Sequence, residues 1–189
     1  YDLAEKLQIN LAQPRIICMG LLEKYQGADV MFAAFKIIVE KIKDVQFIII
    51  GFPNIAKYKE YCRELGIAKN VIFLGKIEYA KLPPYLALAE VAVAPKISLT
   101  EGDGKIYNYM AMGLPTVAFD RSTSREILGE TGVFAKLNDS QDNAEKIVFL
   151  LNNKEQAKIL GQRARNRAVA QLSWRAVGER INNVYLTKL

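Results

Sequence analysis

Two lysines flank a glycine-bearing loop in the middle of the chain. Lys96 and Lys105 stand on either side of a Gly-Asp-Gly sequence at 102–104. Ammonium groups bind phosphate oxygens, and glycines let a ligand come close to the backbone. The helix expected from Lys105 onward adds free N–H groups that favour an anion. We therefore predict that this loop binds phosphate and sugar groups, with both lysines on the phosphates.

The segments around the loop predict a βαβ unit. An apolar run at 91–95 precedes the loop, and a second one at 116–119 follows the short helix. Both runs are apolar at every position, which is typical of parallel strands covered by helices on both faces. Ligands of such sheets bind at the carboxyl ends of the strands, where the 96–104 loop begins.

The remaining apolar patterns extend this sheet. We expect further strands at 15–19, 45–50, 70–74 and 132–135, a loop at 120–124, and helices at 28–41, 54–65, 81–89, 124–128, 142–152, 154–170 and 174–186. The prediction is an α/β fold with a Rossmann-like, three-layer α/β/α parallel sheet. One domain is expected over 14–189, after a linker or peripheral helix over 1–13. Gly20 and Gly51 end the first two strands; Gly51 either admits a ligand or makes a plain turn.

Composition and charge restrict the class of partner. The 189 residues are 51% hydrophobic and 24% charged, as in an ordinary globular domain. There is no histidine, and no acidic cluster has metal-ligand spacing, so we expect no metal and no cofactor. The net charge of +6 suits nucleoside diphosphates or an anionic membrane surface, whereas no nucleic-acid motif is present. Cys18 and Cys62 are expected to be free thiols of a cytoplasmic protein, with peripheral membrane contact left open.

Residues 105–118 carry a more specific signal. Their sequence, Lys-Ile-Tyr-Asn-Tyr-Met-Ala-Met-Gly-Leu-Pro-Thr-Val-Ala, resembles a motif in the nucleotide-sugar half of retaining GT-B glycosyltransferases, group 1 or family 4-like. The family motif runs Lys-x-x-Glu-Tyr-Met-Ala-x-Gly-x-Pro-Val-Val-Ala, and its glutamate holds the donor's ribose. This chain has Asn108 there, which can accept and donate hydrogen bonds without charge. With Tyr-Gln-Gly at 25–27, it is similar to a branch that carries an amide.

The resemblance implies that the chain is the C-terminal, donor-binding half of a GT-B enzyme. Such an enzyme transfers a sugar from a nucleotide-diphosphate sugar to an acceptor hydroxyl, with retention and without a metal. Lys96 and Lys105 would be the catalytic cations on the leaving diphosphate. The implied donor contacts are Gly20, Lys24 and Gln26 near the pyrophosphate, Lys76 and Ile77 at the base, and Asn108 at the ribose. Gly102, Gly104 and Ile106 would contact the donor through their backbone, and Glu101 and Asp103 are competing contacts for the sugar. Gly51 is a further expected donor contact.

The resemblance also implies what this segment alone cannot do. The acceptor, a glycan or lipid-linked sugar, would bind an N-terminal domain outside this sequence, so the segment is expected to be inactive by itself. A start at Tyr1 rather than methionine agrees with an excised domain. Leu21 and Gln26 stand where the family often has cations, which leaves a degenerate nucleotide-sugar-binding or partner-docking module open. A nucleotide-sugar epimerase of GT-B shape is a further alternative.

Overall fold

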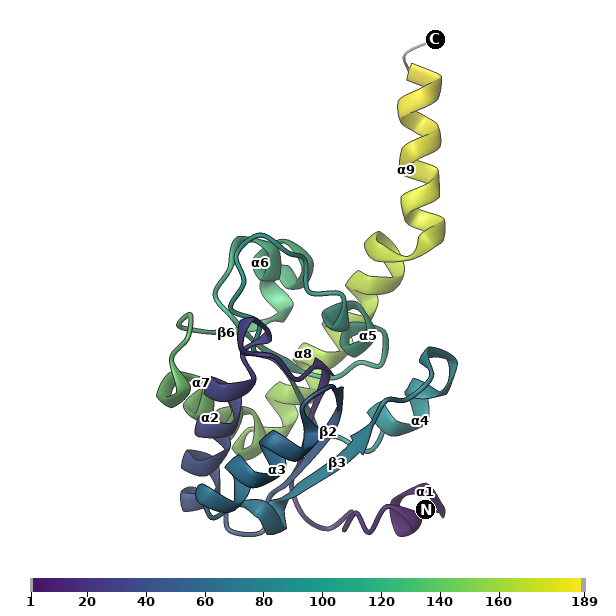
Figure 1. Ribbon diagram of the computed structural model, residues 1–189. Coiled ribbons are helices and arrows are strands. Elements are labelled where there is room, and N and C mark those ends of the chain that lie inside the picture. Colours follow the sequence, from purple (N-terminus) through teal and green to yellow (C-terminus); the bar gives the residue numbers. More distant parts are fainter. Residues whose placement is uncertain (1, 188–189) are drawn as a thin grey trace.

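Six parallel strands form one sheet in residues 2–187, the part of the chain that the computed structural model describes (Figure 1). The strands are β1 (Arg15–Leu21), β2 (Gln46–Phe52), β3 (Val71–Gly75), β4 (Val91–Ala94), β5 (Thr116–Phe119) and β6 (Val133–Ala135). Their order is β3-β2-β1-β4-β5-β6, and every neighbouring pair is parallel. The order reverses between β1 and β4, which is where open α/β sheets bind ligands. The predicted Rossmann-like α/β class is confirmed.

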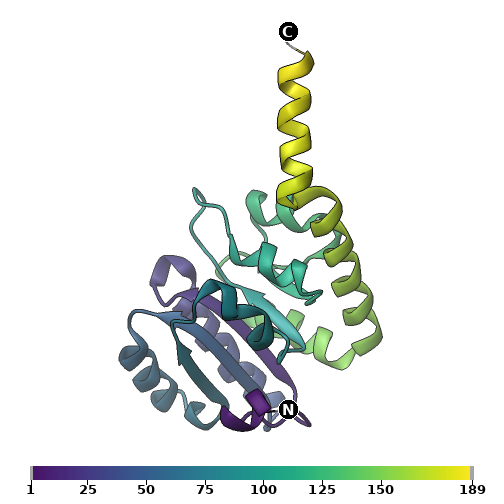
Figure 2. The same ribbon diagram turned by 90° about the vertical axis from the view of Figure 1, so that its right-hand side faces the viewer.

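Helices cover both faces of this sheet (Figure 2). One face is covered by α2 (Ala28–Lys41), α3 (Ile55–Glu64) and α7 (Ser140–Asn152). The other is covered by α1 (Asp2–Lys6), α4 (Leu82–Leu86), α5 (Lys105–Ala111), α6 (Ser122–Leu128) and α8 (Lys154–Arg167). Along β1, Ile16 and Cys18 belong to the first apolar layer and Ile17 to the second. Burial on both faces explains why the central positions of these strands are apolar.

Several element boundaries differ from the predictions. β1 continues through Leu21 and β2 through Phe52, so Gly20 and Gly51 are paired residues inside strands rather than strand ends. α6 begins at Ser122, within the segment predicted to be a loop. α8 ends at Arg167, and a π-helical turn at Ala168–Leu172 (η5) connects it to α9 (Trp174–Thr187). Short 3₁₀ turns are η1 (Lys24–Gln26), η2 (Ala68–Asn70), η3 (Tyr79–Lys81) and η4 (Gly129–Thr131).

The two ends of the described chain are arranged differently. Near the N-terminus, Ala4 of α1 and Ile9 are buried in the second apolar layer. α9 projects away from the sheet and buries none of its residues (Figure 1). The predicted linker at 1–13 and domain at 14–189 include residues 1, 188 and 189, which lie outside the described residues. Within residues 2–187, no helix is long and apolar enough to cross a membrane.

Both cysteines are free and buried, which leads to a chemical prediction. Burial raises the pKa of Cys18 to about 11 and that of Cys62 to about 12. At about pH 8 only about one thiol in a thousand or fewer is then a thiolate, the form that reacts with disulfide reagents. We expect the native protein to resist labelling by a chromogenic disulfide, and we expect both thiols of the unfolded protein to react with it rapidly. Rapid labelling of the native protein would contradict this burial.

Candidate functional site

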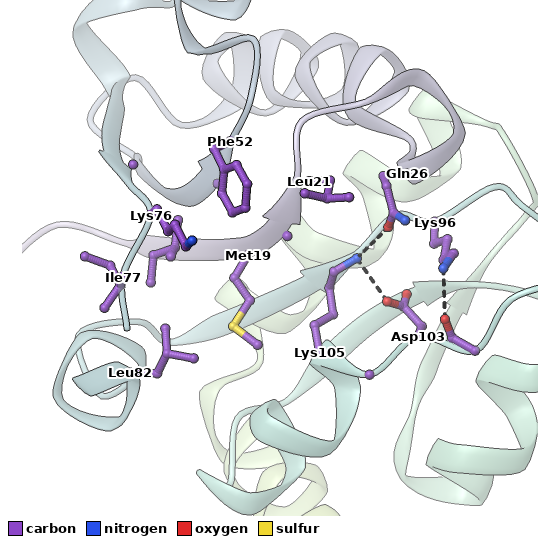
Figure 3. Close-up of a pocket in the computed structure, with 16 residues that line it drawn as sticks. Met19, Leu21, Gln26, Phe52, Lys76, Ile77, Leu82, Lys96, Asp103 and Lys105 are labelled. Carbon is purple, nitrogen blue, oxygen red and sulfur yellow. Dashed lines mark hydrogen bonds and ion pairs between the residues drawn. The ribbon is translucent and has the colours of Figure 1, made fainter. Parts of the chain in front are cut away.

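A cavity of about 350 Å³ opens at the carboxyl edge of the sheet (Figure 3). It lies where β1, β2 and β3 end and where the loop between β4 and α5 begins. Its lining residues are Met19, Gly20, Leu21, Gln26, Ile50, Gly51, Phe52, Gly75, Lys76, Ile77, Leu82, Lys96, Gly102, Asp103, Gly104 and Lys105. The cavity therefore sits at the edge where the topology predicts a ligand.

Lys105 lies at the polar end of this cavity and is only 8% exposed. Its Nζ is 2.9 Å from Asp103 Oδ1 and 3.4 Å from Gln26 Oε1 (Figure 3). Its aliphatic stem passes over Gly20, where a Cβ would lie 2.9 Å from Lys105 Cε. Gly20 also has a φ of 135°, which side chains rarely adopt. A side chain at this position of β1 would therefore have a strained backbone and would displace the end of the Lys105 side chain.

Tyr109 fixes the helix that carries Lys105. Its ring is fully buried in the second apolar layer, next to Ile106 and Met110 of the same helix. The Tyr109 hydroxyl accepts a hydrogen bond from Met19 N at 2.8 Å and lies 3.4 Å from the Val93 carbonyl oxygen. α5 is thereby tied to β1 and β4, so Lys105 is held at the point where these two strands diverge.

Lys96 organises the loop on the other side of the cavity. Its Nζ donates to the Gly102 carbonyl oxygen at 2.9 Å and lies 2.6 Å from Glu101 Oε2. Only 5% of Lys96 is exposed, whereas the Glu101 side chain is about half exposed. Two largely buried cations thus face one cavity from opposite ends of one loop. Such cations attract phosphate oxygens more strongly than surface lysines because water screens them less.

The opposite end of the cavity is apolar. Met19, Phe52, Ile77 and Leu82 contribute side chains there (Figure 3). Lys76 Nζ lies 5.2 Å from the centroid of the Phe52 ring, within the range of a cation–π contact. An aromatic ring beside aliphatic side chains suits a flat group such as a nucleobase. The cavity therefore has two lysines with their carboxylate partners at one end and apolar side chains at the other, as a nucleotide is anionic at one end and flat at the other.

Ten of the fourteen residues predicted for the site line this cavity. Four lie outside the lining: Lys24, Glu101, Ile106 and Asn108. Lys24 is exposed on η1. Ile106 is fully buried, and its N–H already donates to the Asp103 carbonyl oxygen at 3.0 Å. Asn108 is half-buried next to the loop, where its Nδ2 donates to the Gly104 carbonyl oxygen at 3.3 Å.

The sequence prediction named Ile77 at the apolar end of the cavity but missed Met19, Phe52 and Leu82, and it also missed one buried cation. Phe52 directly follows Gly51, at which the second strand is predicted to end. An aromatic residue at that point was the available signal for the apolar end. Leu82 lies at the start of α4 and gave no such signal. The buried cation is Arg121, which follows β5 and is only 3% exposed. Its Nη2 donates to the Glu101 carbonyl oxygen at 2.6 Å and so supports the loop.

Comparison with known proteins agrees with this architecture. Residues 2–167 match the family model described as glycosyl transferases group 1. A GDP-mannose-dependent monoacylated alpha-(1-6)-phosphatidylinositol monomannoside mannosyltransferase of Corynebacterium glutamicum is 27% identical over 95% of this chain and 49% of its own length. A sulfoquinovosyl transferase of Arabidopsis thaliana is 27% identical over 95% of this chain and 36% of its own length.

Solved structures show the same fold. Sucrose-phosphate synthase from Thermosynechococcus elongatus superimposes with a TM-score of 0.84 at 22% identity, over 98% of this chain and 48% of its own. Anabaena HepE in complex with UDP gives 0.86 at 17% identity, over all of this chain and 52% of its own. The chain thus spans about half the length of these structures and half or less of the curated relatives above. The family match covers most of the chain, and the protein belongs to the glycosyl transferases group 1 family, with the fold of one GT-B domain.

Proposed function

We propose that this chain is the donor-binding domain of a hexosyltransferase that uses a nucleotide-diphosphate sugar, retains the anomeric configuration and needs no metal. The observation that carries the proposal is the pair of largely buried lysines, Lys96 and Lys105, at one end of a cavity whose other end is apolar. The diphosphate binds against the two lysines and the backbone of 102–104. The base lies on Phe52 and Ile77, beside Lys76.

The same cations serve the reaction. When the glycosidic bond to the donor sugar breaks, negative charge grows on the leaving diphosphate. Fixed cations already pointing at that position stabilise the transition state more than the ground state, an effect that can reach several kcal/mol. Lys105 suits this role because Asp103 and Gln26 hold its ammonium in place. Asn108 binds the ribose, since its amide lies at the base of the same loop.

The acceptor binds elsewhere in our proposal. The chain spans half or less of relatives such as the Corynebacterium mannosyltransferase, and the acceptor, a glycan or lipid-linked sugar, uses the remainder of a longer protein. The segment alone is accordingly inactive in transfer but able to bind donor. Peripheral contact with a membrane stays a prediction, which co-sedimentation with anionic vesicles tests.

Calorimetric titration with UDP, GDP and ADP, and with their sugars, tests donor binding. The relatives named above include one that depends on GDP-mannose and one solved with UDP, so they do not determine which base the donor of this chain carries. We expect one nucleotide to bind at least about tenfold more tightly than the others, because the three bases present different hydrogen-bond donors and acceptors to the backbone at Lys76 and Ile77. Addition of EDTA should leave the affinity unchanged. The absence of binding by all three at millimolar concentration would contradict the proposal.

A further inference from the structure

A buried arginine with unpaired donors contacts the loop of the candidate site. Arg121 follows β5 at the start of α6, and its Nη2 donates to the Glu101 carbonyl oxygen. Its Nε and Nη1 are buried and have no hydrogen-bond partner within residues 2–187. A buried guanidinium that leaves donors unpaired is costly, so these two groups require a physical explanation.

Asp103 carries the complementary unpaired acceptor. Its Oδ1 is ion-paired with Lys105 at 2.9 Å, while Oδ2 is buried without a partner in the described part of the chain. Burial lowers the pKa of Arg121, and Asp103, ahead of Glu101, is the first carboxylate that opposes this shift. The Asp103 carboxylate therefore lies in the field of two buried cations and uses only one of its oxygens.

This arrangement conflicts with a simple phosphate site. Asp103 already neutralises Lys105, so a diphosphate that approaches Lys105 also meets a carboxylate of its own sign. The conflict disappears if Asp103 can leave Lys105 without becoming an unpaired buried charge. The backbone on either side of Asp103 is not tightly packed, because a Cβ built on Gly102 or on Gly104 would meet no atom outside its chain neighbours within 4 Å.

We propose that Arg121 is the alternative counter-ion of Asp103: when a nucleoside diphosphate occupies Lys105, the Asp103 carboxylate moves onto Nε and Nη1 of Arg121. The carboxylate is then paired in both states, and the charge of Lys105 becomes available to phosphate only when ligand is present. Arg121 is a positioning residue, because it acts through Asp103 and does not line the cavity. The inference rests on the proposed function, since it requires an anionic ligand at Lys105.

A double-mutant cycle tests this exchange of counter-ion, in which Asp103 leaves Lys105 and pairs with Arg121. The 189-residue chain, Arg121→Gln, Asp103→Asn and the double variant are titrated with the nucleoside diphosphate that binds the unmodified chain best. We expect Arg121→Gln to weaken binding about tenfold when Asp103 is present, because the displaced carboxylate loses a charge-assisted partner. In the Asp103→Asn background the same substitution should change affinity by less than about twofold, since no carboxylate needs a new partner. Arg121→Lys keeps the charge and should lose less affinity than Arg121→Gln.

The outcomes separate three roles for Arg121. Equal losses in both backgrounds would overturn the exchange, because they are expected if Arg121 only supports the Glu101 carbonyl or binds phosphate directly. If Arg121→Gln fails to fold in a thermal unfolding control, the cycle is run with Arg121→Lys, and a loss independent of Asp103 again overturns it. If the unmodified chain binds no nucleoside diphosphate, the proposed function is wrong, and the exchange of counter-ion, which depends on it, is wrong as well. If it binds but the cycle shows no coupling, only the exchange fails.

Discussion

Replacing Lys105 with alanine is expected to remove most of the affinity for nucleoside diphosphate. The ammonium is largely buried and held in place by Asp103 and Gln26, so a cation from solvent does not take its position when the side chain is removed. Loss of one buried, hydrogen-bonded charge from such a contact costs about 2 to 5 kcal/mol, or about 30-fold and more in affinity. Calorimetric titration of the variant measures this loss. Lys158→Ala is the matched control, because Lys158 is an exposed residue of α8.

The same substitution also removes the ion-pair partner of Asp103. A buried carboxylate left alone destabilises a fold by about 3 kcal/mol or more, and pairing of Asp103 with the unpaired donors of Arg121 would limit that loss in this variant. The variant Lys105→Ala/Asp103→Asn separates the two effects, because it restores stability without restoring the cation. We expect it to unfold near the temperature of the unmodified chain and still to bind nucleotide poorly. Equal affinities of the Lys105 and Lys158 variants would exclude Lys105 from the phosphate site.

Replacing Gly27 with alanine is expected to be the most destabilising single change near the site. Gly27 has a φ of 80°, and a Cβ built on it would lie 1.7 Å from the Pro95 carbonyl oxygen. Because the obstructing atom belongs to the backbone, η1 or the end of β4 must move. We expect a loss of about 3 kcal/mol or more in the free energy of unfolding, measured by urea denaturation. Gln26 would move away from Lys105 as well.

Gly66 provides the control for this prediction. It has a similar φ of 73°, but no atom lies within 4 Å of a Cβ at that position. Gly66→Ala therefore carries the backbone strain without the collision and should cost about 1 to 2 kcal/mol. Similar losses for the two variants would show that the close approach of Gly27 to Pro95 has no energetic importance.

The parallel sheet could be predicted because its signal is local. Strands such as Val91–Ala94 are apolar at every position, and that pattern has few explanations other than burial on both faces. The strand ends were less predictable. Glycine has a weak strand preference, so Gly20 and Gly51 suggest strand ends. In the structure the two residues pair with each other across β1 and β2, because pairing across the sheet outweighs this preference.

The site was predictable in its position and less so in its contacts. The two lysines could be assigned to the loop from spacing alone. Their partners depend on how the loop folds back on itself, so the pairing of Lys105 with Asp103 rather than with a solvent ion could not be deduced. Ile106 was expected to offer its amide to a ligand, but the turn into α5 brings the Asp103 carbonyl oxygen to that amide. Arg121 gave no signal because only tertiary structure places β5 beside the loop.

Chemical-shift mapping of the bound nucleotide tests the central claim most directly. The isotope-labelled chain is titrated with the nucleoside diphosphate selected by calorimetry, and backbone amide shifts are followed. A second cavity of about 250 Å³, lined by Val91, Gly113 and Lys158 among others, lies at the start of β4 and serves as the internal reference. The account predicts the largest shifts at Gly20, Gly51, Gly102 and Gly104, with little change at Gly113. Shifts centred on Gly113, with none at the carboxyl edge, would contradict it.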